Sequence, residues 1–85
     1  MPKLSVIIPV YNEEKTIKKI IEKVKSVKLK DFSKEIIVVE DYSNDNTKKV
    51  LGSLKDNSIK IFYHNINKGK GAAIRTALKN STGDI

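Results

Sequence analysis

Three short apolar runs alternate with segments of helical pattern along the 85-residue chain, and this alternation restricts the fold more than any other feature. The runs are KLSVIIPV (residues 3–10), EIIVVE (residues 35–40) and IKIFYH (residues 59–64). Strands that are apolar on both faces and alternate with helices are typical of a parallel sheet with helices on both sides. The sequence therefore predicts a three-layer α/β fold with a Rossmann-like, doubly wound sheet in the strand order 3-2-1.

The segments that follow the apolar runs are predicted to be helical. We expect helices over about residues 13–29 and 45–55, and a third that begins near Gly71 and ends before the STGD segment. Asn12 is the predicted N-cap of the first helix. Apolar residues recur at helical spacing and are predicted to face the sheet; in the first two helices they are Ile17, Ile20, Ile21, Val24, Val27, Val50, Leu51 and Leu54.

The chain carries a formal net charge of +7, and its basic residues concentrate in the first predicted helix and just beyond it. On an amphipathic helix these lysines occupy the solvated face, and we interpret them first as a solubilising surface. A membrane surface and nucleic acid are the alternative partners for such a face. A nucleic-acid-binding module needs aromatic side chains beside its lysines, and the predicted helix has none. We therefore predict no nucleic-acid partner.

Cysteine is absent and His64 is the only histidine, which disfavours a disulfide framework and a zinc site. The first apolar run is too short for a signal peptide or a membrane span. These features fit a reducing compartment, and we expect a cytoplasmic protein. With no linker or repeat, residues 1–85 are predicted to form one domain.

Polar residues follow each apolar run, where the carboxyl ends of parallel strands share one edge of the sheet. The adjacent acids Glu40 and Asp41, several amides and two tyrosines are predicted to meet there. Such a crevice suits a polar, partly aromatic ligand such as a nucleotide. The alternative is that the acids only turn the chain, which we favour for Glu40 but not for Asp41.

The loop NKGKG, before the third predicted helix, is a candidate phosphate site. Its glycines, Gly69 and Gly71, would let backbone amides approach an anion, with Lys68 and Lys70 beside them. We give equal weight to the alternative that these glycines only permit a tight turn. The spacing matches neither a P-loop nor a dinucleotide-binding fingerprint.

Three segments, at this order and spacing, resemble the N-terminal part of family 2 glycosyltransferases with the GT-A fold: LSVIIPVYNEEKTI, EIIVVEDYSNDNT and NKGKGAAIRTALKNSTGDI. Within that family the chain is most similar to polyprenyl-phosphate (dolichol-phosphate) mannosyl- and glucosyltransferases. The resemblance implies transfer of a sugar, with inversion, from a UDP- or GDP-sugar to an acceptor that we expect to be a polyprenyl phosphate. It also implies a location in the cytoplasm or at the cytoplasmic face of a membrane.

The resemblance implies roles for individual residues. The second acid of the pair, Asp41, corresponds to the residue that usually contacts the base. Tyr42 stands where the family usually has glycine, and a positive φ there would strain a tyrosine by about 1 kcal/mol. The nucleotide-sugar-binding residues implied are Pro9, Tyr11, Glu13, Glu40, Asp41, Ser43, Lys68, Gly69, Lys70 and Gly71.

The same family holds a divalent metal, Mg²⁺ or Mn²⁺, with an Asp-x-Asp motif that would follow the TGD segment. This motif does not occur in the 85 residues. We therefore expect an incomplete domain that holds no metal, supplies no catalytic residue and has no transferase activity alone.

The helical pattern ends where a fourth strand should begin beside the first, which predicts an exposed sheet edge and self-association through it.

A noncatalytic, response-regulator-like domain is a further alternative. It shares the acid pair, but the segment YHNINKG lacks the aspartate that would accept a phosphate.

Overall fold

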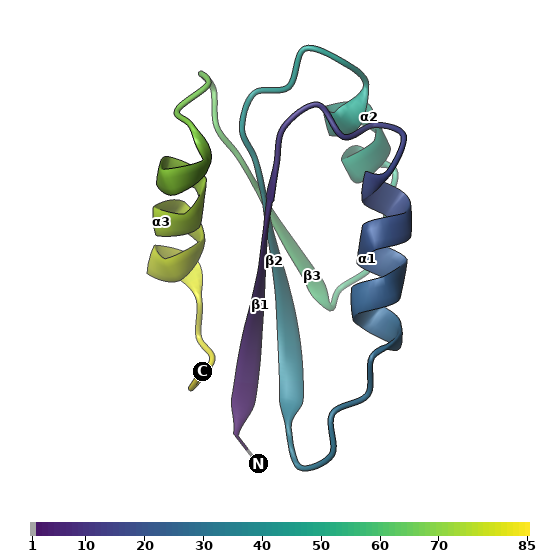
Figure 1. The fold of residues 1–85 in the computed structure, drawn as a ribbon, viewed down its shortest axis with the longest axis vertical. Coiled ribbons are helices and arrows are strands. Elements are labelled where there is room, and N and C mark those ends of the chain that lie inside the picture. Colours follow the sequence, from purple (N-terminus) through teal and green to yellow (C-terminus); the bar gives the residue numbers. More distant parts are fainter. Residues whose placement is uncertain (1) are drawn as a thin grey trace.

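A computed structural model describes residues 2–85, in which strands and helices alternate without exception. The elements are β1 (Lys3–Val10), α1 (Ile17–Ser26), β2 (Ser33–Glu40), α2 (Thr47–Gly52), β3 (Ile59–Tyr63) and α3 (Lys70–Asn80). Helices α1 and α2 cover one face of the sheet, and α3 covers the other (Figure 1). The predicted three-layer α/β arrangement is confirmed.

The sheet has the order β1-β2-β3, with both outer strands parallel to the central strand. This is the predicted order 3-2-1 read from the opposite edge. In the ladder, Ile7 pairs with Ile37, which pairs in turn with Lys60. All three carboxyl ends therefore lie at one end of the sheet, at the top of Figure 1.

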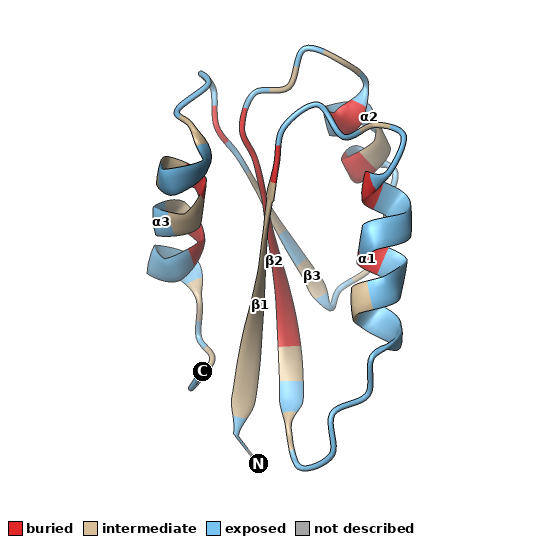
Figure 2. Cartoon of the chain, in the orientation of Figure 1, coloured by how far each residue is buried: buried red, intermediate tan, exposed pale blue. Residues whose placement is uncertain are grey.

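Strand β2 lies between two apolar clusters, one on each face of the sheet. Ile36 and Val38 join the cluster under α1 and α2, whereas Ile37 and Val39 pack against α3. Successive side chains of a strand point to opposite faces, so a strand covered on both sides needs an unbroken apolar run. The red stretch of β2 in Figure 2 shows this burial.

The bounds of the first two helices differ from the prediction. Helix α1 begins at Ile17 with Thr16 as N-cap, not at residue 13, and α2 covers only Thr47–Gly52. Asn12 is not a cap: its φ of 53° is left-handed, a conformation that asparagine tolerates. The third helix begins and ends as predicted.

Two apolar residues of the lysine-rich segment do not face the sheet as predicted. Ile17 and Ile21 are buried, but Ile20 and Val27 are exposed. Val27 is exposed because α1 ends at Ser26 and leaves it in the following loop, whereas Ile20 lies within α1 and is partly exposed there. The lysines from Lys15 to Lys30 are exposed, as a solvated face requires. Among residues 2–85, no helix has the length and apolar character to span a membrane.

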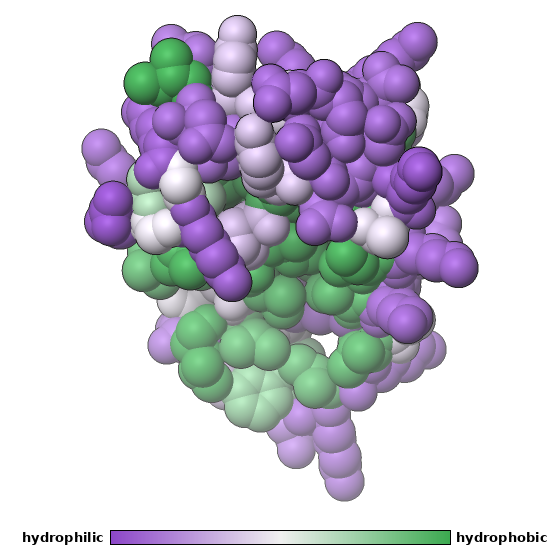
Figure 3. All heavy atoms as spheres, turned by 45° about the horizontal axis from the view of Figure 1, so that its top comes forward, coloured by the Kyte–Doolittle hydropathy of each residue, from purple (hydrophilic) through white to green (hydrophobic). Residues whose placement is uncertain are grey.

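The segment that follows α3 lies beside the outer edge of β1. The Ser5 amide donates to the Ile85 carbonyl at 2.8 Å, and the Ile85 amide donates to the Lys3 carbonyl at 3.2 Å. Two hydrogen bonds from one residue to the two neighbours of Leu4 are the pattern of parallel strands, with Ile85 beside Leu4. The predicted exposed edge is therefore wrong for the first residues of β1. Apolar surface remains visible elsewhere (Figure 3), and self-association stays a prediction.

Candidate functional site

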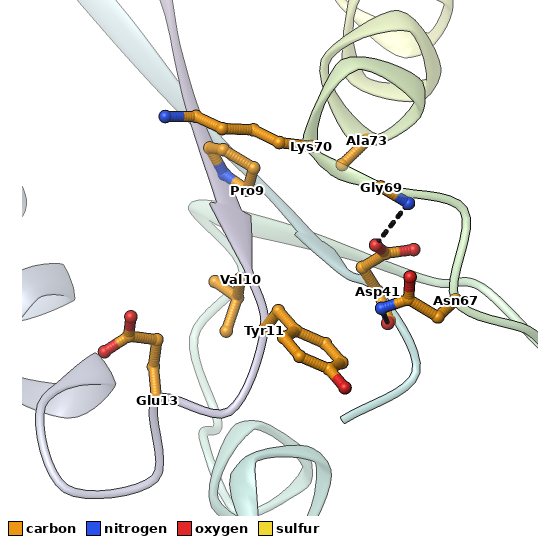
Figure 4. A pocket seen from close by; sticks show the side chains of 9 residues that line it. All are labelled: Pro9, Val10, Tyr11, Glu13, Asp41, Asn67, Gly69, Lys70 and Ala73. Atoms are coloured by element: carbon orange, nitrogen blue, oxygen red, sulfur yellow. Dashed lines mark hydrogen bonds between the residues drawn. The ribbon is translucent and has the colours of Figure 1, made fainter. Parts of the chain in front are cut away.

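A cleft of about 400 Å³ opens at the carboxyl end of the sheet, where the sequence predicted a crevice. It lies between the end of β1 and the loop that leads into α3 (Figure 4). Its lining residues are Pro9, Val10, Tyr11, Glu13, Asp41, Asn67, Gly69, Lys70 and Ala73. The structure thus brings six of the ten predicted site residues to one cleft and leaves Glu40, Ser43, Lys68 and Gly71 outside its lining.

The loops after β1 and β2 are joined by reciprocal hydrogen bonds that hold one wall of the cleft. The Asn12 amide donates to Ser43 Oγ at 2.9 Å, and the Asn44 amide donates to Asn12 Oδ1 at 2.7 Å. Asn44 Nδ2 also donates to the Tyr11 hydroxyl at 3.1 Å. Ser43 therefore supports the site from behind, and Tyr11 is held with part of its ring open to a ligand.

Glu13 is placed by the neighbouring loop and not by a helix of its own. Its amide donates to Oγ1 of the buried Thr47 at 2.8 Å, and its Oε2 accepts from the Thr16 hydroxyl at 2.6 Å. These bonds fix the backbone that carries the Glu13 carboxylate toward the cleft.

Asp41 is the organising residue of the cleft, although only 3% of its surface is exposed. Its Oδ1 accepts from the Lys68 amide and lies 2.8 Å from His64 Nδ1. Its Oδ2 accepts from the Gly69 amide at 2.8 Å, the bond drawn in Figure 4. Gly69 has a φ of 90°, which favours glycine. Asp41 therefore fixes the loop into α3.

The hydrogen bonds of Asp41 keep its carboxyl group ionised. Burial alone would raise the pKa of Asp41, but the bonds from His64 and from the amides of Lys68 and Gly69 lower it below its ordinary value. An ionised carboxylate only accepts hydrogen bonds. Because Oδ2 has the single donor Gly69 among residues 2–85, it can accept another from a ligand in the cleft.

Glu40 turns the chain after β2, which is the structural role that the alternative interpretation gave it. It is buried, and its Oε1 accepts from the Ser43 amide at 2.7 Å. This bond tightens the turn that contains Tyr42, whose φ is 57°. The condition for strain at Tyr42, a positive φ, is therefore met.

The loop before α3 contributes its glycine and one of its lysines to the cleft. Gly69 and Lys70 line it, whereas Lys68 contributes its amide to Asp41. Gly69 is also the N-cap residue of α3, so the positive end of that helix faces the same space.

Four residues that shape the site are not among the ten predicted to bind the nucleotide-sugar, although His64 and Asn67 were expected at the same edge of the sheet. Val10, Asn67 and Ala73 line the cleft, and His64 supports Asp41 from behind. Asn67 Nδ2 also donates to the Asp41 carbonyl at 3.2 Å. Their positions in the sequence indicate them. His64 ends the third apolar run, Asn67 follows it, and Ala73 lies in a run of small residues near the glycines.

Within the described range 2–85, no group of three or more His, Cys, Asp or Glu side chains is placed to hold a metal ion. The cleft contributes Glu13 and Asp41, and Asp41 is already bound by protein donors. These residues do not fit a metal site.

Residues 5–85 match the family model described as "Glycosyl transferase family 2". The chain is 37% identical to an undecaprenyl-phosphate 4-deoxy-4-formamido-L-arabinose transferase of Proteus mirabilis, in an alignment that covers 98% of this chain and 27% of that protein. It is also 37% identical to a dolichyl-phosphate beta-glucosyltransferase of Trichomonas vaginalis, with 96% and 28% covered. The chain thus spans little more than a quarter of these relatives.

A solved structure shares the fold. A mannosyltransferase from Pyrobaculum calidifontis, in complex with GDP-Man and Mn²⁺, superposes with a TM-score of 0.81 and 27% identity. The match covers 98% of this chain and 25% of the mannosyltransferase. The arrangement of strands and helices is therefore shared with a quarter of that structure.

Proposed function

The chain belongs to glycosyl transferase family 2, and from this premise we propose that its 85 residues form the donor-nucleotide-binding part of a sugar-transferring enzyme. In this proposal the cleft binds the nucleotide of a UDP- or GDP-sugar. The complete protein would transfer the sugar, with inversion at the anomeric carbon, to a lipid phosphate. Residues 1–85 are proposed to supply binding and orientation but no catalytic group.

The Asp41 carboxylate is the observation that carries this proposal. Asp41 lines the cleft as an ionised acceptor, and the Gly69 amide fixes the direction of its Oδ2. A nucleobase N–H or a ribose hydroxyl presents the donor that such an oxygen requires. Tyr11 offers a ring face for the base on the opposite wall. One cleft therefore provides both polar recognition and stacking.

The diphosphate of the donor is proposed to lie toward Gly69 and Lys70. The N-terminus of α3 and the Lys70 ammonium provide positive charge at that side of the cleft. Asp41 and Glu13 are negative, so the base end and the phosphate end of a nucleotide would be distinguished by charge.

A divalent cation is proposed only for the complete enzyme. The similar mannosyltransferase structure contains Mn²⁺ together with GDP-Man, which supports Mg²⁺ or Mn²⁺ as the cofactor. Such an ion would stabilise the charge of the leaving diphosphate. No ligand for it is assigned among the described residues.

The acceptor is proposed to be a polyprenyl phosphate. The names of two similar proteins, an undecaprenyl-phosphate transferase and a dolichyl-phosphate glucosyltransferase, support this class of acceptor. A lipid acceptor implies work at a membrane surface, so we propose a cytoplasmic or peripheral location at the cytoplasmic face.

Calorimetric titration of the chain with UDP-glucose and with GDP-mannose tests the proposal. At least one should bind, and Asp41→Asn should weaken binding by about 1–3 kcal/mol because a charged hydrogen bond is lost. Asp31→Asn is the matched control, since Asp31 lies in an exposed loop outside the cleft and its positive φ suits asparagine. Failure of both donors to bind, or equal affinity of the Asp41 variant, would contradict the proposal.

A further inference from the structure

His64, the only histidine of the chain, lies behind the cleft between β3 and α3. It is 9% exposed, and both of its ring nitrogens have a partner. Nδ1 lies 2.8 Å from Asp41 Oδ1, and Nε2 lies 2.8 Å from the Thr76 hydroxyl oxygen. The ring therefore connects the principal acceptor of the cleft to the middle of α3.

The chemistry of the partners assigns the protons of this chain of hydrogen bonds. The Asp41 carboxylate can only accept, so Nδ1 of His64 must donate. The Thr76 hydroxyl can donate or accept, so it adapts to whichever role Nε2 has. A hydrogen bond at one ring nitrogen sets where the proton lies, so the Asp41 carboxylate, which only accepts, fixes a proton on Nδ1.

The bond from Nδ1 restricts the rotation of the Asp41 carboxylate. Oδ1 is occupied by His64 and by the Lys68 amide, which leaves Oδ2 as the oxygen on the cleft side. The ring is held at both nitrogens, and the backbone that carries it is held by the His64 amide, which donates to the Glu40 carbonyl at 2.9 Å. The direction of Oδ2 thus depends on a residue that does not line the cleft.

We propose that His64 is a positioning residue of the nucleotide cleft, which orients Asp41 toward the ligand through its Nδ1–H group while Thr76 contacts the other ring nitrogen. The inference rests on the proposed function in so far as the ligand is a nucleotide. A merely structural role, as a polar contact between β3 and α3, would make both ring nitrogens equally important for ligand affinity. Positioning makes only Nδ1 important.

Two amide substitutions separate the nitrogens. In His64→Asn the side-chain NH₂ group can occupy the place of Nδ1 and donate to Asp41, but the contact with Thr76 is lost. In His64→Gln the amide reaches the place of Nε2, and Asp41 loses its donor. Both variants remove ring packing, so both should lower thermal stability.

The two variants should differ in their affinity for UDP and GDP, measured by calorimetry. We expect His64→Asn to remain within about threefold of the unchanged chain and His64→Gln to bind about tenfold more weakly or worse, as for loss of a donor to a buried charge. Equal losses of affinity, in proportion to the losses of stability, would overturn the proposal.

Nitrogen-15 NMR of the ligand-free chain gives a second measurement, and the single histidine makes its assignment unambiguous. The ring should carry a proton on Nδ1, and Thr76→Val should leave that proton in place because the Asp41 carboxylate holds it. The Gly69 amide proton should shift in His64→Gln and stay near its place in His64→Asn. An Nε2–H tautomer, or equal Gly69 shifts in both variants, would refute positioning.

The two measurements distinguish failure of this inference from failure of the proposed function. If neither UDP nor GDP binds the unchanged chain, donor binding is refuted, and the NMR results alone decide the role of His64. If a nucleotide binds and both His64 variants bind it as tightly as the unchanged chain, the function stands and the positioning role falls.

Discussion

Glu35 and Thr82 are 47 positions apart in the chain, yet two hydrogen bonds join them at the amino-terminal end of the sheet. The Thr82 amide donates to Glu35 Oε1 and the Thr82 hydroxyl donates to Oε2, both at 2.8 Å. Glu35 is 6% exposed and also accepts from the Ser5 hydroxyl at 2.7 Å and from Lys60 Nζ at 3.3 Å. This buried carboxylate fastens the segment after α3 to the edge of β1.

The Glu35 network should make stability depend on pH in the acid range. Burial would raise the pKa of Glu35, but hydrogen bonds from Thr82, Ser5 and Lys60 bring it far below its ordinary value of 4.5. A lowered pKa in the folded state stabilises the fold above the ordinary value, and this stabilisation is lost as pH falls below it. Glu35→Gln should therefore lower the free energy of unfolding at pH 7 by about 1–3 kcal/mol and by less at pH 3.

Urea unfolding at both pH values measures this difference. Glu22→Gln, an exposed substitution on α1, is the control and should have little effect at either pH. A Glu35→Gln deficit that stays constant between pH 7 and pH 3 would show that the carboxylate charge is not the cause.

Gly83 should not tolerate a side chain. A Cβ atom there would overlap Ser5 Oγ and lie 2.9 Å from the Lys3 carbonyl oxygen. Ser5 Oγ cannot easily withdraw, because it donates to Glu35 and accepts from the Gly83 amide. Gly83→Ala should therefore destabilise the chain by about 1–3 kcal/mol.

Hydrogen exchange at the Ser5 amide reports whether the segment after α3 stays bound to β1, since that amide donates to the Ile85 carbonyl. It should lose protection in Gly83→Ala. Gly52→Ala is the matched control, because nothing lies within 4 Å of its added Cβ. Retention of both stability and Ser5 protection in Gly83→Ala would contradict the close packing.

Replacing Tyr42 by glycine should stabilise the chain. Its φ of 57° costs a residue with a Cβ about 1–2 kcal/mol, and its 52% exposure means that little burial is lost. The greater entropy of glycine in the unfolded chain offsets about 0.5–1 kcal/mol. Thermal unfolding should show a net gain of up to about 1.5 kcal/mol for Tyr42→Gly and none for Tyr42→Ala, which keeps the Cβ. Equal stabilities of the two variants would exclude backbone strain as the cause.

The lysines of α1 should not recognise nucleic acid. Lys19 and Lys23 are exposed, and no aromatic side chain occurs in Ile17–Ser26 for stacking. Fluorescence anisotropy with single-stranded and duplex DNA should show at most weak binding that disappears as salt rises to about 150 mM. Lys19→Glu with Lys23→Glu should affect only the low-salt signal. Tight binding of one sequence over others at the higher salt would disprove this prediction.

The sequence determined the type and order of the elements. A short apolar run such as the IIVV of EIIVVE favours a strand covered on both faces, and the alternation with helical patterns then predicts a parallel sheet with its carboxyl ends at one edge. The structure has its cleft at that predicted edge, and six of the ten predicted site residues line it. The reason is that hydrophobic periodicity reflects the local geometry of the backbone.

Tertiary structure decided how Glu13 is held and which acid lines the cleft. The Glu13 amide donates to Thr47, the first residue of α2, a contact that no local pattern in residues 11–17 contains. Glu40 and Asp41 are neighbours of like charge, yet Glu40 accepts from Ser43 in its own turn, whereas Asp41 accepts from Lys68 in the loop before α3. The role of Asp41 thus depends on donors far away in the sequence, because a carboxylate binds whichever donors the packed chain brings to it.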